Sequence, residues 1–136
     1  MSLHSADQST RNRLMPRLSG QPLRKLKQAL AYYCEEKGRR ITIEYMLLRD
    51  INDSDEQRDK LIDFCKDLNV HINLLTYNPV FGTGYKPSDI QTLLRWEKEI
   101  SSSGIPVSVR QSKGTDIAGA CGQLKGKRMT DTTQGQ

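Results

Sequence analysis

Three short apolar segments, each preceded by a helix-like stretch, constrain the fold of this chain more than any other feature. The apolar segments are residues 40–48, 70–76 and 105–110, where β-branched side chains are frequent, as in buried strands. The stretches before them repeat apolar residues at intervals of three and four positions, which is typical of helices; they cover residues 21–37, 52–68 and 87–104. Connections of this length between successive strands require crossovers, so we expect an α/β fold with a parallel sheet.

Three strands alone do not make a closed domain. They are too few to close a barrel, and a parallel sheet is stable only when both of its faces are covered. A hydrophobic content of 35% is also low for a self-contained globule. We therefore expect residues 1–124 to form a partial (β/α) barrel of about three βα units that is a piece of something larger. Residues 125–136, rich in Lys, Thr, Gln and Gly, are predicted to be a disordered tail.

Local signals mark the ends of the expected helices. Pro22 suits a first helical turn, and Gly38 suits the position just after a helix. The sequence Asn-Asp-Ser at 52–54 predicts a loop followed by a helix N-cap. Residues 1–20 show no helical pattern, and we expect them to be irregular.

The chain has three cysteines, Cys34, Cys65 and Cys121. Their number is odd and they form no C-x2-C pair, which predicts reduced thiols and neither a disulfide framework nor a metal site. Cys34 and Cys65 fall on the apolar faces of two expected helices, so we interpret both as structural residues of the core.

Polar residues follow the expected strands at their carboxyl ends, where parallel α/β folds bind ligands. Asn78 comes directly after the second strand, and the turn after the third strand leads to Cys121. If an earlier strand ends near the start of the chain, Ser2 and His4 join the same edge. Glu44, within the first strand, is either an ordinary charge facing water or a carboxylate pointing into a polar interior.

Cys121 is the residue in this group whose side chain is best suited to covalent chemistry. Its small neighbours Ala120 and Gly122 leave the sulfur uncrowded, and Arg110 and Lys113 lie close in sequence. Positive charge near a thiol lowers its pKa and favours the reactive thiolate. The alternative is that Cys121 is a small hydrophobe buried beneath a glycine-rich turn, as free cysteines commonly are.

The formal net charge of +5 favours an anionic partner. The basic residues crowd the first part of the chain, against the single acid Asp7; they are Arg11, Arg13, Arg17, Arg24, Lys25 and Lys27. Such a cluster attracts the phosphate backbone of RNA, but no aromatic residues interleave with it to stack on bases. The cluster therefore predicts charge attraction without recognition of base sequence.

No apolar run approaches the length of a membrane span. The first twenty residues also lack the apolar centre of a signal peptide. We expect a cytoplasmic protein with no membrane partner.

Several segments of the sequence form an ordered set of motifs. They are SLHSA at 2–6, RNRLMP at 11–16, ITIEYMLL at 41–48, IND at 51–53, INLLTYNP at 72–79 and VRQSKGTDIAGACGQL at 109–124. This set resembles the carboxyl-terminal half of the RlmN/Cfr family of radical S-adenosylmethionine (radical SAM) RNA methyltransferases, from Ser2 to about Lys127. The resemblance implies that the expected partial barrel is of the radical SAM type.

The resemblance also implies roles for individual residues. Ser2, Leu3 and His4 match a segment that contacts S-adenosylmethionine, and Asn78 matches an asparagine that binds the same cofactor. Cys121 matches a cysteine that is first methylated to S-methylcysteine and then passes the methyl-derived carbon to an RNA base. The implied product is an adenine methylated on a ring carbon, C2 in preference to C8, in 23S ribosomal RNA and, in some members, transfer RNA. The thiol is needed because such a C–H group is too weak a nucleophile for direct methyl transfer.

One departure from the family pattern bears on activity. The family holds a 4Fe-4S cluster with three cysteines in a C-x3-C-x2-C pattern, which this sequence lacks. The cluster ligands would then belong to a missing amino-terminal half, a partner of this chain, and we expect the chain alone to be inactive. Two hypotheses follow: the chain is the carboxyl-terminal part of a radical SAM RNA methyltransferase, or it is a non-catalytic half-barrel that binds RNA or a protein.

Overall fold

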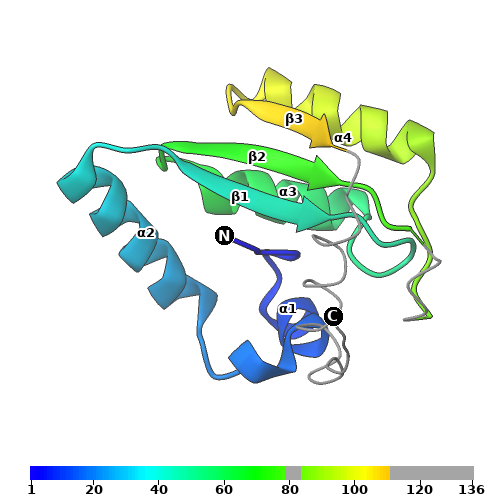
Figure 1. Cartoon of the computed structure of the whole chain (residues 1–136), viewed down its shortest axis with the longest axis horizontal. Helices are drawn as coiled ribbons and strands as arrows, with labels where there is room; N and C mark the ends of the chain where they lie inside the picture. The colour runs from blue at the N-terminus through cyan, green and yellow to red at the C-terminus, as the bar shows by residue number, and fades with distance from the viewer. Residues whose placement is uncertain (79–83, 111–136) are drawn as a thin grey trace, which may run out of the picture.

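The computed structural model, which describes residues 1–78 and 84–110, contains one three-stranded parallel sheet with helices packed on it (Figure 1). The strands are β1 (Ile41–Met46), β2 (Val70–Leu75) and β3 (Val107–Arg110), and they lie in the order β1-β2-β3. The helices are α1 (Gln8–Leu14), α2 (Leu23–Lys37), α3 (Asp55–Cys65) and α4 (Ile90–Ser102), with a short 3-10 helix at Pro16–Leu18. The predicted α/β fold with a parallel sheet is confirmed.

The two faces of the sheet differ because successive side chains of a strand point to opposite sides. Ile43 pairs in register with Ile72, and Tyr45 with Leu74, and these four side chains are fully buried in the main core. Helices α3 and α4 add their apolar faces to this core: Leu61, Phe64, Cys65, Leu93, Trp96 and Ile100. The sheet is therefore covered on one face by its own crossover helices.

The other face of the sheet carries a row of polar residues. Glu44 pairs in register with Asn73, and Asn73 with Ser108, while Ser2 forms an isolated parallel bridge with Glu44. Glu44 is half-buried and Asn73 is buried. Of the two interpretations of Glu44, the position within this polar row favours the second.

Helix ends follow the predicted local signals. Gly38 adopts the left-handed conformation, with φ of 61°, and its N–H donates to the Cys34 carbonyl at 2.9 Å, which closes α2. The Ser54 hydroxyl accepts a hydrogen bond from the Gln57 N–H and so caps α3. Helix α3 ends at Cys65, before the predicted end at 68, because the chain turns through a left-handed residue at Asp67.

The prediction that residues 1–20 are irregular is wrong, because they contain α1. The Asp7 carboxylate caps this helix by accepting hydrogen bonds from the Thr10 N–H at 3.0 Å and the Thr10 hydroxyl at 2.8 Å. Only Arg11 and Leu14 of α1 are buried, so the helix has too few apolar residues for its periodicity to be visible in the sequence.

Cys65 is buried in the core, as predicted, whereas the same prediction for Cys34 is wrong. Cys34 is half-buried, and its thiol lies 3.6 Å from the Asn69 carbonyl oxygen, to which it donates. It sits near the carboxyl end of α2, where the neighbouring residues are exposed. The turn leading to Cys121 and the tail at 125–136 lie outside the described residues. Within the described part of the chain, no helix is long and apolar enough to cross a membrane.

Candidate functional site

The first residues of the chain extend the sheet beyond β1. The Leu3 N–H donates to the Glu44 carbonyl at 2.9 Å, and the Glu44 N–H donates to the Met1 carbonyl at 2.8 Å. These bonds make Ser2 a parallel neighbour of Glu44, as expected if an earlier strand ends there. The segment Ser2 to His4 therefore reaches the carboxyl edge of the sheet beside β1.

His4 is the most constrained residue at this edge. It is 1% exposed and left-handed, with φ of 60°. Its Nδ1 accepts a hydrogen bond from the Met46 N–H at 3.0 Å, so the neutral ring carries its proton on Nε2. No described residue accepts a hydrogen bond from Nε2. A buried donor without an acceptor is costly, which is the mark of a group that awaits a ligand or another part of the protein.

The charge state of His4 follows from its surroundings. Burial, followed by the positive charges of Arg11 and the chain's amino terminus, lowers the pKa of His4 from 6.5 to about 4. The imidazole is therefore neutral near pH 7 and can donate one hydrogen bond from Nε2. A neutral imidazole does not attract an anion by charge. What His4 offers at this edge is one hydrogen-bond donor, the Nε2–H group, with a fixed direction.

Arg11 supports the same segment from α1. Its guanidinium donates through Nε to the Leu3 carbonyl at 3.3 Å and through Nη1 to the Gln21 Oε1 at 3.0 Å. Arg11 is 2% exposed, and this burial lowers its pKa below the ordinary arginine value. The sequence prediction counted Arg11 in a basic cluster that attracts phosphate, and the structure corrects this for Arg11, because its donors are used inside the fold.

Asn52 also holds this segment, although the sequence placed it only in a predicted loop and in the motif at 51–53, with no role assigned to it. Its Nδ2 donates to the carbonyls of His4 at 2.8 Å and Met46 at 2.9 Å, and its Oδ1 accepts from the Leu48 N–H at 2.8 Å. Asn52 is fully buried, with 0% exposure. The three bonds satisfy the whole carboxamide, so Asn52 acts as a cross-link between the Ser2 to His4 segment and the end of β1.

Asn78 follows β2 by three residues and is exposed. The strands β1 and β2 are parallel, so their carboxyl ends lie at one edge of the sheet (Figure 1). His4, which is bonded to Met46 at the end of β1, and Asn78, which follows β2, belong to this edge. Ser2 and Leu3 lead to this edge, with Leu3 buried in the core and Ser2 half-buried. Cys121, the remaining predicted site residue, lies outside the described residues.

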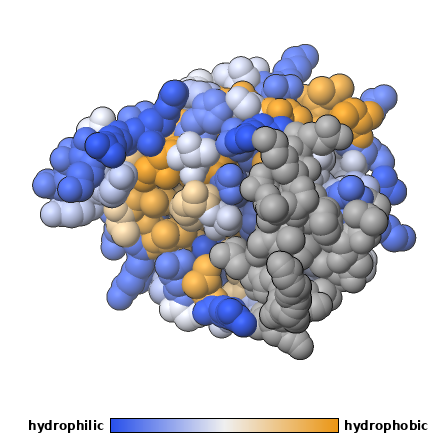
Figure 2. Space-filling model, in the orientation of Figure 1, coloured by the Kyte–Doolittle hydropathy of each residue, from blue (hydrophilic) through white to orange (hydrophobic). Residues whose placement is uncertain are grey.

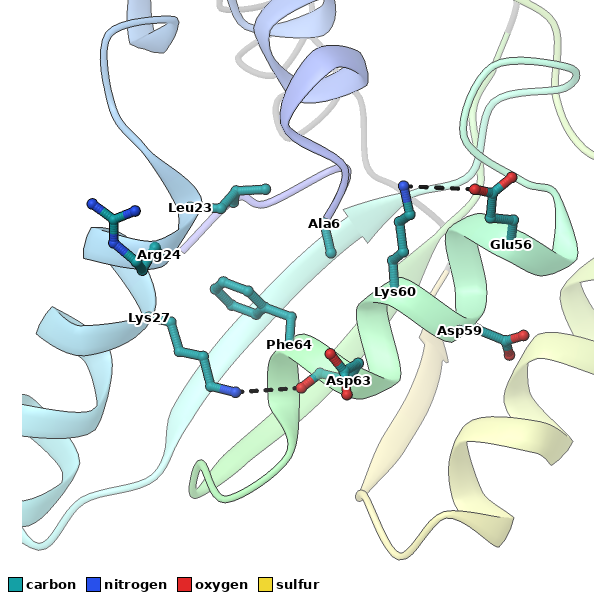
Figure 3. A pocket seen from close by; sticks show the side chains of 9 residues that line it. All are labelled: Ala6, Leu23, Arg24, Lys27, Glu56, Asp59, Lys60, Asp63 and Phe64. Atoms are coloured by element: carbon teal, nitrogen blue, oxygen red, sulfur yellow. Dashed lines mark hydrogen bonds and ion pairs between the residues drawn. The ribbon is translucent and has the colours of Figure 1, made fainter.

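Two open grooves lie beside α2. One has a volume of about 580 Å³ and runs between α2 and α3, where basic residues of α2 oppose acidic residues of α3 (Figure 3). Several of these charges already have partners: Lys27 donates to the Asp63 carbonyl at 3.3 Å, and Lys60 lies 3.6 Å from Glu56. The other groove, of about 450 Å³, is lined mainly by apolar residues, Met1, Ala29, Leu30, Tyr33 and Ile41, together with Arg40 and Thr42.

Figure 2 shows apolar side chains gathered on the face of the molecule that borders α2. Tyr32 and Tyr33 of this helix are 66% and 42% exposed. Leu23 is the only residue of α2 that is buried. An apolar surface of this kind on a parallel α/β fold is typical of a face that another element covers.

Known proteins with similar sequences include several that are described as probable RNA methyltransferases. The chain is 38% identical over 131 residues to a probable dual-specificity RNA methyltransferase RlmN of Caldanaerobacter subterraneus, covering 96% of this chain and 38% of that protein. It is 40% identical over 124 residues to the protein of the same description from Treponema pallidum, covering 91% of this chain and 36% of that protein. The sequence matches no family model.

Two solved structures have a similar fold, and one of them is a methyltransferase. The fold superposes on the crystal structure of a radical SAM methyltransferase from Sphaerobacter thermophilus with a TM-score of 0.80 and 36% identity, over 93% of this chain and 37% of that one. A domain of pyruvate-formate lyase-activating enzyme from Bacteroides vulgatus gives a TM-score of 0.60 at 16% identity, over 80% of this chain and 64% of that one. The second likeness concerns the fold alone.

The fold thus defines the class: this is a partial α/β barrel of the radical SAM type. Within that class, the chain resembles the RlmN-type radical SAM methyltransferases, in a way consistent with their carboxyl-terminal part. It spans 36–38% of the length of the RlmN proteins reported above.

Proposed function

We propose that the chain is the carboxyl-terminal part of a radical SAM RNA methyltransferase. In this proposal Ser2, Leu3, His4 and Asn78 contact S-adenosylmethionine, and Cys121 becomes S-methylcysteine during the reaction. The target is a ring carbon of an adenine, C2 in preference to C8, in 23S ribosomal RNA or transfer RNA. The observation that carries the proposal is the buried His4 Nε2–H donor, for which no described residue is the acceptor. It lies at the carboxyl edge of the sheet, in a fold similar to that of a radical SAM methyltransferase.

The residues of this edge fit a polar cofactor. The His4 Nε2–H supplies one donor, the Asn78 carboxamide contains polar atoms of both kinds, and Ser2, which carries a hydroxyl, is half-buried on the same segment as His4. S-adenosylmethionine offers matching carboxylate, amine and hydroxyl groups, and when bound it supplies the methyl group and, with a reduced 4Fe-4S cluster, a radical.

The part assigned to Cys121 requires a free thiol that loses its proton as the S–C bond forms. Among the described residues with a positive charge, Arg110 is the nearest to Cys121 in sequence. It is exposed at the end of β3. No role in cluster binding is assigned to Cys34 or Cys65, because both are engaged elsewhere in the fold.

The amino-terminal half of such an enzyme is the proposed protein partner. The groove beside α2, which is lined mainly by apolar residues, supports this, because a further part of a barrel would cover it. The exposed basic residues Arg13, Arg17 and Arg24 support RNA as the substrate.

A reconstitution experiment tests the proposal. The chain is mixed with the cluster-bearing amino-terminal part of an RlmN relative and with unmodified 23S ribosomal RNA, and methyladenine is measured by mass spectrometry of nucleosides. We expect methylation that is lost with Cys121→Ala and kept with Cys34→Ala, the matched control. Methylation that survives Cys121→Ala would overturn the role of the thiol.

The alternative is a non-catalytic module that binds RNA or a protein. The exposed basic residues and the lack of a C-x3-C-x2-C motif favour this alternative. Such a module binds RNA with an affinity that falls steeply with salt, and the affinity is unchanged by Cys121→Ala. RNA binding without methylation in the reconstituted mixture would favour it.

A further inference from the structure

His4 occupies a backbone conformation that needs support. A left-handed φ of 60° is unfavourable for a residue with a side chain, and histidine adopts it only when surrounding contacts hold it there. The support in this fold is the Asn52 carboxamide, which donates to the His4 carbonyl at 2.8 Å. The same Nδ2 group donates to the Met46 carbonyl at 2.9 Å.

These two carbonyls belong to the two residues that set the direction of the imidazole. The Met46 N–H donates to the His4 Nδ1 at 3.0 Å, which fixes one side of the ring and leaves the proton on Nε2. Asn52 therefore binds the backbone of both partners of the bond that orients the ring. Its position is fixed in turn by the Tyr45 hydroxyl, which donates to the Asn52 carbonyl at 2.8 Å, and by the Leu48 N–H.

We propose that Asn52 is a positioning residue of the candidate site: it locks His4 in its left-handed conformation and thereby fixes the direction of the Nε2–H donor. The donor serves a ligand group that accepts a hydrogen bond. This inference deepens the proposed function and rests on it for the identity of that ligand, S-adenosylmethionine, whereas the lock itself depends only on the described contacts.

The lock is tested by nuclear magnetic resonance on the complete chain with labelled histidine. In the wild type we expect His4 to be the Nε2–H tautomer with a pKa of about 4. In Asn52→Ala the His4 backbone loses the hydrogen bond that holds its left-handed conformation, so the ring is no longer held in its buried position. We expect a mixture of tautomers and a pKa that rises toward 6.5, because burial is the main cause of the lowered value. The charges that act on His4, Arg11 and the amino terminus, are unchanged in this variant.

A matched control separates this effect from loss of stability. Ile100→Val removes one methylene group from α4 in the same core, and Ile100 makes no polar contact with His4. We expect the His4 tautomer and pKa to stay at their wild-type values in Ile100→Val. A pKa that remains near 4 in Asn52→Ala, or that rises equally in Ile100→Val, overturns the proposal.

Two further measurements keep the test decisive if Asn52→Ala does not fold. Asn52→Ser retains a small donor, and a His4 pKa above the wild-type value is expected there as well. In the wild type, the two Asn52 carboxamide hydrogens should exchange slowly with water, because both acceptors are buried carbonyls. Rapid exchange of these hydrogens would overturn the lock without any variant.

Binding of S-adenosylmethionine is measured separately, by calorimetry, on the chain reconstituted with the amino-terminal part of an RlmN relative. We expect Asn52→Ala to weaken binding by at least about tenfold, which corresponds to the loss of one directed hydrogen bond to the ligand. Failure of the wild type to bind would overturn the cofactor part of the proposed function and leave the lock supported by the His4 spectra. Equal binding by wild type and Asn52→Ala, with a disturbed His4, would overturn the link between the lock and the ligand.

Discussion

The aromatic rings of Tyr45 and Trp96 pack against each other with their centroids 5.1 Å apart and an interplanar angle of 50°. This contact joins β1 to α4 in the main core, where both residues have 0% exposure. The Trp96 Nε1 also donates to the carbonyl of Asp53 at 3.3 Å, and Asp53 is the residue that follows Asn52. The core and the candidate site are therefore connected through neighbouring residues.

Removal of the Trp96 side chain should destabilise the fold strongly. We expect Trp96→Ala to lower the free energy of unfolding by about 3–5 kcal/mol, because the large cavity cannot be filled by its neighbours. The measurement is a urea titration followed by circular dichroism. Ile90→Ala, on the same helix but 63% exposed, is the control and should change the free energy by less than about 0.5 kcal/mol. Equal effects of the two variants would contradict the assignment of the buried face of α4.

Gly38 should tolerate substitution less well than Gly20. Both positions have space for a methyl group, but only Gly38 has a positive φ, of 61°. We expect Gly38→Ala to cost about 1 kcal/mol of unfolding free energy through backbone strain. Gly20→Ala should be neutral or slightly stabilising, because it restricts the unfolded chain. Thermal unfolding of both variants checks this, and a larger loss for Gly20→Ala would be the opposite result.

The sequence predicted the sheet and its helices because their signals are local. Gly38 and the Asn-Asp-Ser run at 52–54 report their turn and cap chemistry directly, and the apolar strands cannot be placed anywhere but in a core. Helix α1 escaped prediction because its one strong signal, the Asp7 cap, precedes a segment that buries only Arg11 and Leu14. A helix whose buried residues are one arginine and one leucine has no apolar stripe that a sequence pattern could reveal.

The candidate site was predictable in part. The carboxyl-edge rule brought Asn78 and His4 together from strand order alone. The supports of His4 were not predictable, because Arg11 and Asn52 act on it from distances in sequence of seven and forty-eight residues, which only the folded chain brings together. Single polar residues in a basic helix and a loop give no sequence signal that they are buried.

The free energy of unfolding should depend on pH because of the lowered pKa of His4. Its pKa is about 4 in the fold and 6.5 in the unfolded chain, so the unfolded state binds more protons between these values. The stabilisation is complete above pH 6.5 and is lost as the pH falls toward 4, by about 3 kcal/mol in all. Asp7, whose pKa is lowered mainly by its hydrogen bond with Lys60, adds a loss of the same sign at lower pH, below its usual value of 3.8.

Urea titrations at a series of pH values from 7 to 4.5 measure this dependence. His4→Asn is the control, because asparagine tolerates a positive φ and does not titrate. We expect the variant to be less stable near pH 7 but to have a much flatter dependence on pH. A slope equal to that of the wild type would show that other groups cause the acid sensitivity.

Cys65 should be unreactive in the folded chain, and Cys34 should react. Burial raises the pKa of the Cys65 thiol to about 12, with Lys27 acting in the opposite direction. At pH 8 the thiolate fraction of Cys65 is therefore on the order of 10⁻⁴, and the sulfur is also shielded in the core. Alkylation by iodoacetamide, measured for each cysteine-containing peptide by mass spectrometry, should label Cys34 first.

The two cysteines should react at similar rates in urea, which controls for differences between the peptides. The Cys121→Ala variant simplifies the measurement to the two described thiols. Because Cys65 packs between α3 and the sheet, its labelling in the folded chain requires α3 to open, so its rate relative to the rate in urea gives the free energy of that opening. Labelling of Cys65 as fast as Cys34 in the folded chain would mean that α3 does not stay packed on the sheet without a further part of the barrel.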